Sequence, residues 1–216
     1  IGLSFVGNQV DNVHVVEIAN AQLDVDGAAR LDAADSTAIL GLSLGVGVAS
    51  DKFAGMGNAT ANLIGNRTQV LVGDAGAGPD STRIDAGSLH ATAIDASFIG
   101  SLAGNVAIGS KAALGAAVTW NDIANLTSVD VTRSRLDSRG AVTLAADNQA
   151  TILAGAVAGA VGNNAAISGS FAWSEIGNTT RASLGDSRVA AGGLDVRADS
   201  SSDLFTLSGA IAAPGT

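Results

Sequence analysis

The chain of 216 residues carries a net charge of -9, with 11 basic residues and no cysteine. These numbers exclude a disulfide framework and thiolate metal sites, and they argue against nucleic acid or an anionic membrane surface as a partner. Apolar residues make up 47% of the chain, which predicts a buried core, but aromatic residues are only 3%, so small side chains must build it. Apolar stretches such as residues 150–161 are too short and too rich in Gly and Ala for a membrane span.

Internal repetition organises the chain from its first residues. The segment Ser4–Ile18 matches the segment that begins at Ser170, and Trp120 matches Trp173 at an offset of 53 residues. A second block follows each copy and ends in a glycine, and these glycines lie 60, 53 and 53 residues apart: Gly27, Gly87, Gly140 and Gly193. The pattern predicts about four repeats of ~53 residues, at 1–49, 50–109, 110–162 and 163–216. The longer first interval indicates a loop insertion at residues 73–80.

Within each repeat the dominant pattern is alternation rather than helical periodicity. Large apolar residues at Leu40–Val48 alternate with Gly and Ser, and within residues 150–161 Leu153, Val157 and Val161 fall on one face and alanines on the other. This pattern predicts a strand that is buried on both sides, with close packing on its small face. Turn residues follow, then a returning strand such as Leu114–Trp120. We therefore expect about five short strands per repeat and almost no helix.

Repeats of this kind bury their apolar residues by stacking on one another. The sequence favours an all-β fold, a parallel β-solenoid in which each strand pairs with its equivalent one repeat away. The alternative is a stack of β-hairpins whose long strands pair antiparallel. Whether each repeat forms one wide coil or two narrow coils stays open.

One asparagine recurs in every repeat, at Asn12, Asn66, Asn125 and Asn178. Thr follows two residues after the last three, as it does after Asn58, so these sites fit the N-glycosylation rule. The interpretation that we favour is a structural ladder in which each Asn takes left-handed backbone geometry at a turn and hydrogen-bonds to the next coil. Glycosylation is the alternative.

Other residues suggest ligand sites only weakly. The pairs Arg83/Asp85 and Arg135/Asp137 project from one face of a strand, which indicates neutralised charge columns, with calcium as the sharper alternative. Otherwise the sequence contains no metal-binding or cofactor motif. His14 and His90 lie in unrelated phases of the repeat, and no catalytic motif is present.

Trp120 and Trp173 are one period apart and could form an exposed strip for glycans or host proteins. Packing of the two rings is the interpretation that we favour.

The blocks "SRVAAGGLDVRADS" and "SRLDSRGAVTLAAD", joined by "ILAGAVAGAVGNNAAISGSFAWSEIGNTTRASLGDS", resemble repeats of large bacterial filamentous adhesins. These are the leukotoxin-type and filamentous-haemagglutinin-like exoproteins. The resemblance implies secretion to the bacterial cell surface, a β-helical rod, and roles in cell adhesion or biofilms. No signal pattern opens the chain, and we expect a shaft segment of a longer protein that stacks on neighbouring repeats or on like subunits end to end. A glycan- or protein-binding module is the alternative, and a β-helical polysaccharide-active enzyme is the least favoured.

Overall fold

The computed structural model describes every residue except 51, 74–75, 77, 79 and 215–216. The chain is all-β, with 86% of residues in strands, and no helix occurs in the described part. Its strands, in chain order, are β1 Gly2–Val10, β2 Val13–Ile18, β3 Gln22–Ala49, β4 Phe53–Ile64, β5 Arg67–Val72, β6 Thr82–Gly109, β7 Ala112–Ile123, β8 Leu126–Thr132, β9 Ser134–Ser138, β10 Ala141–Gly162, β11 Ala165–Ile176, β12 Thr179–Gly185, β13 Arg188–Ala190 and β14 Gly193–Pro214.

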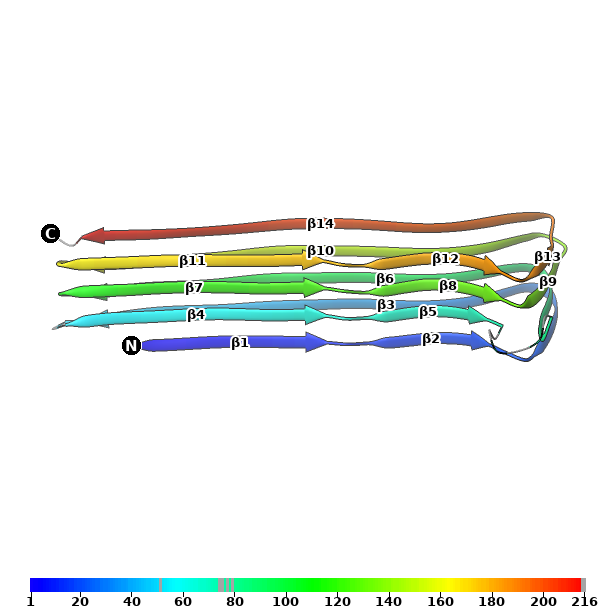
Figure 1. Ribbon diagram of the computed structural model, residues 1–216, viewed down its shortest axis with the longest axis horizontal. Coiled ribbons are helices and arrows are strands. Elements are labelled where there is room, and N and C mark those ends of the chain that lie inside the picture. Colours follow the sequence, from blue (N-terminus) through cyan, green and yellow to red (C-terminus); the bar gives the residue numbers. More distant parts are fainter. Residues whose placement is uncertain (51, 74–75, 77, 79, 215–216) are drawn as a thin grey trace.

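These strands form three parallel sheets (Figure 1). We call β1-β4-β7-β11 the tip sheet, β2-β5-β8-β12 the base sheet, and β3, β6, β10 and β14 the long sheet, with β9 and β13 at its base edge. The chain crosses the tip sheet and the base sheet, turns, and returns in one long strand. The tip is the end where the long sheet turns into the tip sheet, and the base is the opposite end.

Each strand lies beside its equivalent in the next repeat, in parallel register. Ala112 pairs with Ala165, Leu126 with Thr179, and Leu89 with Val142. The prediction of a parallel β-solenoid is confirmed, and the antiparallel hairpin alternative is wrong. One repeat makes one wide coil, because every strand of a repeat finds its partner in the adjacent repeat.

The expectation of five short strands per repeat is wrong, because the return path is nearly continuous. In β6 the block Arg83-Ile84-Asp85 and the glycine after it belong to one strand of 28 residues, and so do the equivalent residues Gln22-Leu23-Asp24 and Gly27 in β3. In the later coils the same path is broken once, between β9 and β10 and between β13 and β14. Extended backbone tolerates this glycine, so the block lengthens the strand instead of ending it.

Two register irregularities mark this return path. A register shift between Val25 and Ala28 sets Asp26 and Gly27 opposite the single residue Gly87, which is the geometry of a β-bulge. In the last coil Gly192, not Gly193, lies level with Gly140, whose carbonyl accepts its N–H at 2.9 Å. The equivalence of Gly193 with Gly140 is therefore wrong by one residue.

The connection between β5 and β6 is the longest of its kind. Residues 73–81 fill it, whereas Arg133 alone joins β8 to β9. The insertion predicted at residues 73–80 falls here, and residues 74, 75, 77 and 79 lie outside the described part of the chain. Gly73 has a φ of +92°, and a side chain at this position would meet the carbonyl oxygen of Thr132. This position therefore requires glycine.

The core changes character along the strands. In the base half, Val and Leu side chains such as Val70, Leu89 and Val129 fill the space between the sheets. In the tip half, small side chains such as Ala103, Ala117 and Ala156 face one another. The long and tip sheets can therefore approach closely through a thin layer of small residues.

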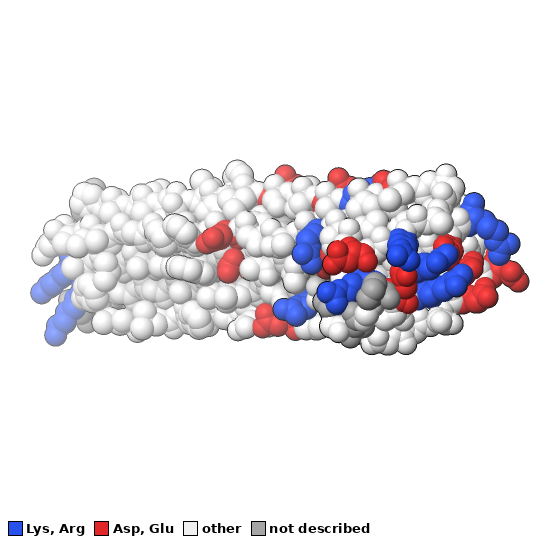
Figure 2. All heavy atoms as spheres, turned by 45° about the vertical axis from the view of Figure 1, so that its right-hand side comes forward, with Lys and Arg blue, Asp and Glu red and all other residues white. Residues whose placement is uncertain are grey.

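The bulky face of the long sheet points outward, which corrects the prediction that its strands are buried on both sides. Leu40 is 79% exposed and Val48 is 71% exposed, while Ser43, of the opposite parity, is buried. The physical reason is that no element of the described chain covers the outer face of the sheet. Figure 2 shows a tip half almost free of charge, whereas Asp, Glu, Lys and Arg gather at the base.

Candidate functional site

The most distinctive surface is the outer side of the long sheet near the tip, which we call the apolar face. It is formed by alternate residues of four neighbouring strands, and none of them has a polar side chain. Its members are Leu40, Leu42, Leu44, Val46 and Val48 of β3; Gly100, Leu102, Gly104, Val106 and Ile108 of β6; Leu153, Gly155, Val157, Gly159 and Val161 of β10; and Phe205, Leu207, Gly209, Ile211 and Ala213 of β14.

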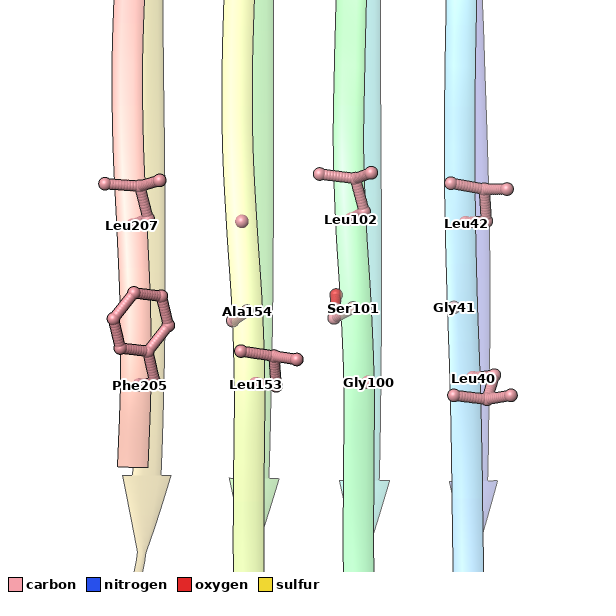
Figure 3. A pocket seen from close by; sticks show the side chains of 11 residues that line it. Leu40, Gly41, Leu42, Gly100, Ser101, Leu102, Leu153, Ala154, Phe205 and Leu207 are labelled. Carbon is pink, nitrogen blue, oxygen red and sulfur yellow. The ribbon is translucent and has the colours of Figure 1, made fainter. Parts of the chain in front are cut away.

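A hollow of about 420 Å³ lies within this face (Figure 3). It forms because Gly100 stands in the row of Leu40 and Leu153, and Gly155 stands in the row of Leu102 and Leu207. A Cβ at Gly100 would come within 2.7 Å of a Leu40 methyl group. The lining is almost entirely hydrocarbon, and its one side-chain hydroxyl, that of Ser101, is buried and hydrogen-bonded to Thr60. The hollow therefore suits an apolar group and has no acid or base in its lining.

The tip sheet carries an aromatic pair on its own outer side. Trp120 and Trp173 are stacked, with ring centroids 6.0 Å apart, and they are 49% and 44% exposed. Gly7 and Ala61 occupy the same row in the first two coils, so the aromatic strip is limited to two coils. The two rings therefore pack against each other and also remain about half exposed to solvent.

Two acidic residues follow in the next outward row. Asp122 lies beside Glu175 in register. Burial, and secondarily the negative charge of Glu175, raise the pKa of Asp122. The row marks the border between the apolar tip half and the charged base half.

The recurring asparagine lies between the tip and base sheets and forms a ladder along the stacking direction. The Oδ1 of each Asn accepts the backbone N–H of its equivalent in the preceding coil: Asn66 from Asn12 at 3.2 Å, Asn125 from Asn66 at 2.9 Å, and Asn178 from Asn125 at 3.0 Å. None of the four has a positive φ, a geometry found at other non-glycine residues such as Asn20 and Asp80. The predicted left-handed backbone is wrong: the four asparagines lie in the short breaks between the strands of the tip and base sheets, and they align there without positive φ.

The side-chain amides of this ladder point into the core. The Nδ2 of Asn66 donates to Asp35 at 2.6 Å, and that of Asn125 donates to Asp95 at 2.6 Å and to Ser97 at 2.8 Å. Asn66 and Asn125 are each only 2% exposed. Because Nδ2 is the atom that N-glycosylation modifies, the folded chain withholds it at both positions.

The other asparagines predicted as ladder residues or acceptor sites are also hydrogen-bonded. Asn58 is buried and donates to Ser43 at 3.0 Å. Asn12 and Asn178 are partly buried, and their Nδ2 atoms donate to Asp35 and Asn148.

The Thr that completes the Asn66 sequon and the Thr that completes the Asn125 sequon also have internal roles. Thr68 and Thr127 are fully buried. Thr127 accepts a hydrogen bond from Asn148 at 3.0 Å, and Thr68 lies 3.5 Å from a carboxylate oxygen of Asp95. The fold thus explains both residues of these two sequons without a sugar.

A column of acidic and amide side chains in the long sheet faces the ladder, and the sequence analysis missed it. Asp35, Asp95 and Asn148 occupy the same position in successive coils. Burial raises the pKa of Asp95, and the neighbouring charge of Asp35 adds to this, while hydrogen bonds from Ser97 and Asn66 oppose it. The three residues share one phase of the repeat, which was the signal available in the sequence.

A second amide ladder was also missed. The Nδ2 of Asn8 donates to Asn62 at 2.9 Å, and that of Asn62 donates to Asn121 at 2.9 Å. Each of these residues precedes the recurring asparagine by four positions. That constant spacing could have identified them.

Charged side chains near the base pair with one another. Arg83 lies 3.6 Å from Asp85 and 3.1 Å from Asp137, and Arg135 lies 2.8 Å from Asp137. The hydrogen bond from Arg135 lowers the pKa of Asp137. These carboxylates are engaged by arginine.

The described residues contain no cluster of His, Asp and Glu suited to a metal ion. His14 contacts Asp35 at 3.1 Å, whereas no contact ties His90 to a site. No helix in the described part of the chain is long and apolar enough to cross a membrane.

Comparisons with protein families, with curated proteins and with solved structures find no match to this chain.

Proposed function

We propose that this chain is a structural segment of an extracellular bacterial adhesin or filament, in which stacked coils form a stiff shaft that presents an adhesive part to the surroundings. The supporting observation is the parallel stacking of equivalent strands in all four coils, tied by backbone pairing and by two amide ladders. The resemblance to filamentous adhesin repeats supports the setting outside the cell. The proposal assigns no catalytic step to the chain.

The dimensions of the coil favour stiffness over reach. Strands pair about 4.8 Å apart, so four coils add only about 19 Å along the stacking direction. The strand of 28 residues in β3 spans roughly 90 Å across it. A stack of such coils is a broad ribbon, which resists bending within its own plane far better than a narrow rod of the same length.

The last coil offers a surface on which another coil fits. Leu204 points inward and is 49% exposed, whereas its equivalent Ile152 is fully buried by the coils on both sides. The edges of β12 and β14 also carry unpaired backbone groups in the described chain. A further coil, from the same chain or from a like subunit, would cover both features.

Tandem copies test the proposal. Eight copies joined in one chain should form a straight ribbon about 150 Å long and about 90 Å wide in electron micrographs. Leu204→Asp in every copy should bend or separate the ribbon at the junctions, because it places a charge between stacked coils. The control Leu207→Asp lies on the outer side of the same strand and should leave the junctions straight. Separate plates on flexible linkers in the unmodified chain would refute the proposal.

A glycan-binding role is the second candidate, and the half-exposed Trp120–Trp173 stack is the observation that favours it. Stacked aromatic rings can contact the apolar face of a sugar ring. Binding on a glycan array that disappears in the Trp120→Ala/Trp173→Ala variant would support this role. Unchanged binding in the variant, or no binding by the unmodified chain, would exclude it at these residues.

A further inference from the structure

The apolar face lies at the upper end of what a monomeric protein leaves uncovered. Its rows of alternate residues run from Leu40 to Val48 across four strands, which gives roughly 600 Å² on one side of the sheet from the strand rise and spacing. Two such faces together would bury about 1,200 Å², which reaches the lower end of stable protein interfaces. The area is therefore sufficient for two copies of the chain to pair through this face.

Two copies can bring these faces together by a two-fold axis that runs parallel to the strands. The axis lies midway between the two faces, level with the gap between β6 and β10. Rotation about it turns the second face over onto the first, keeps the strand direction and reverses the order of the coils. Each row is then opposed by the same row of the second copy, so that β3 faces β14 and β6 faces β10.

In this arrangement a large apolar residue opposes every glycine of the apolar face. At the hollow in Figure 3, Gly100 meets Leu153, and Leu102 enters the space above Gly155. The other glycines are opposed in the same way: Gly104 by Val157, Gly159 by Val106, and Gly209 by Leu44. Antiparallel strands centred on the same row would instead set Gly104 on Gly104, which leaves a gap without contacts. The relief of the face therefore favours parallel strands.

The same axis also matches charges in the polar half of the long sheet. On the outer side near the base, β3 carries Arg30 and Asp32, and β14 carries Asp195 and Arg197 in the same two rows. The rotation sets Arg30 opposite Asp195. It sets Asp32 opposite Arg197, and the two-fold repeats both pairs. Packed sheets lie about 10 Å apart, a gap that an arginine and an aspartate side chain can bridge together.

Contact along both halves of the sheet requires long strands that stay aligned. Figure 1 shows the strands of the long sheet running nearly straight and side by side from base to tip. Three acidic side chains remain on the outer side, and the rotation sets each of them opposite an apolar residue: Asp147 opposite Ile94, Asp199 opposite Ala34, and Asp203 opposite Ala38. In the rows from Arg30 to Val48, no like charges therefore face each other.

We propose that the outer side of the long sheet binds the same side of a second copy of this chain, with the strands of the two copies parallel and their coils in opposite order. This contact is lateral and is independent of the end-to-end stacking proposed above. The matched relief and the matched charges both fit a rigid partner of the same shape. Lipid hydrocarbon is fluid and uncharged, so it would use neither of them.

Sedimentation equilibrium tests the pairing with matched variants. The unmodified chain should reach at least dimer mass at micromolar concentration. Leu102→Lys/Val157→Lys should weaken pairing at least about tenfold, because it places charges at the centre of the contact. The control Leu114→Lys/Val118→Lys lies on the outer side of the tip sheet and should leave the mass unchanged.

Three outcomes of this experiment would overturn the proposal. The first is a monomeric unmodified chain. The second is association that Leu102→Lys/Val157→Lys leaves unchanged, as end-to-end stacking alone would. The third is equal weakening by this variant and by the control.

Reversal of one ion pair tests the orientation. Arg30→Asp sets two acids opposite each other twice in the pair and should weaken pairing at least about threefold. Asp195→Arg in the same chain should restore it. Within one chain the two residues lie three strands apart, which is about 14 Å, so the rescue can arise only between copies. Failure of the rescue would overturn the parallel arrangement.

Cross-linking distinguishes parallel from antiparallel strands, because the chain has no cysteine of its own. An equimolar mixture of Leu42→Cys and Leu207→Cys chains should be linked into mixed dimers by a short thiol cross-linker, since the rotation sets these two positions opposite each other. Neither variant alone should be linked, because its two cysteines would lie three strands apart. Linking of the Leu42→Cys chain to itself would indicate that β3 faces β3, as in an antiparallel pair, and would contradict the proposal.

Flotation with phosphatidylcholine vesicles distinguishes the lipid alternative. The proposal predicts that the dimer stays in the dense fraction. Recovery of the chain with the vesicles, together with a monomeric mass in solution, would replace the second copy by lipid as the occupant of the face.

Discussion

Replacing Asn125 by alanine removes a residue that joins two coils and both layers of the solenoid. Its Oδ1 accepts the buried N–H of Asn66, and its Nδ2 donates to Asp95 and Ser97. Leaving a buried N–H unpaired costs about 1–3 kcal/mol, and losing a hydrogen bond to a carboxylate costs about 1.5–3 kcal/mol. Because the two losses fall on different groups, we expect Asn125→Ala to reduce the free energy of unfolding by about 3–5 kcal/mol.

Urea unfolding followed by circular dichroism measures this change, and the shift in midpoint converts to free energy through the slope of the transition. Asn164→Ala is a matched control, because Asn164 lies in an exposed turn at the tip and its side chain has no partner among the described contacts. The control should change stability by less than about 0.5 kcal/mol. If Asn125→Ala costs less than about 1 kcal/mol, the ladder does not hold the coils together as we argue.

Three further predictions test other parts of the structure. Asp95→Asn, which repeats the amide found at Asn148, should stabilise the fold at neutral pH. The raised pKa of Asp95 means that its contribution to stability is full below its ordinary value of 3.8 and is lost as pH rises through the folded value. The gain should therefore shrink in acid, and a pH-independent gain in urea titrations would contradict this cause. Ile152→Ala should cost about 2–5 kcal/mol in the same assay, whereas Leu153→Ala, on the outer side, should cost less than about 1 kcal/mol; equal costs would contradict the assigned faces. Expression in a glycosylating host should leave Asn125 unmodified in folded protein by mass spectrometry, and a sugar there would contradict its burial.

The repeat length and the parallel register could be predicted because equivalent residues, such as Trp120 and Trp173, recur at the same phase. The direction in which the bulky face points could not. Apart from Thr151, both parities of residues 150–161 are apolar, so alternation alone does not distinguish inside from outside. The choice depends on how closely the two sheets approach, which is a tertiary property set by small residues such as Ala103 and Ala117. Asn62 and Asn121 contained a usable signal for the inward direction of their strands, because both share the inward parity and form hydrogen bonds only within the stack.

The asparagine ladder inside the solenoid could also be predicted only in part. The sequence pattern indicated the recurring asparagine, and the packing of the sheets determined its hydrogen-bond partners. The recurring Asn125 position was predicted as a ladder from its phase. Its partners Asp95 and Ser97 lie about half a coil away in the sequence, and only the folded return strand brings them across the core. Thr127 fits the glycosylation rule in the sequence. Its structural role could not be predicted there, because the buried hydrogen bond that it forms is with a distant strand.

The central claim is that each repeat forms one wide coil, stacked in register with small residues inside and bulky apolar residues outside. Electron cryomicroscopy of the eight-copy chain tests it most directly. The account predicts a straight ribbon with an axial repeat of about 4.8 Å, and side-chain density for Leu102 and Val157 on its outer surface. Two coils per repeat, or density for these side chains between the sheets, would contradict the account.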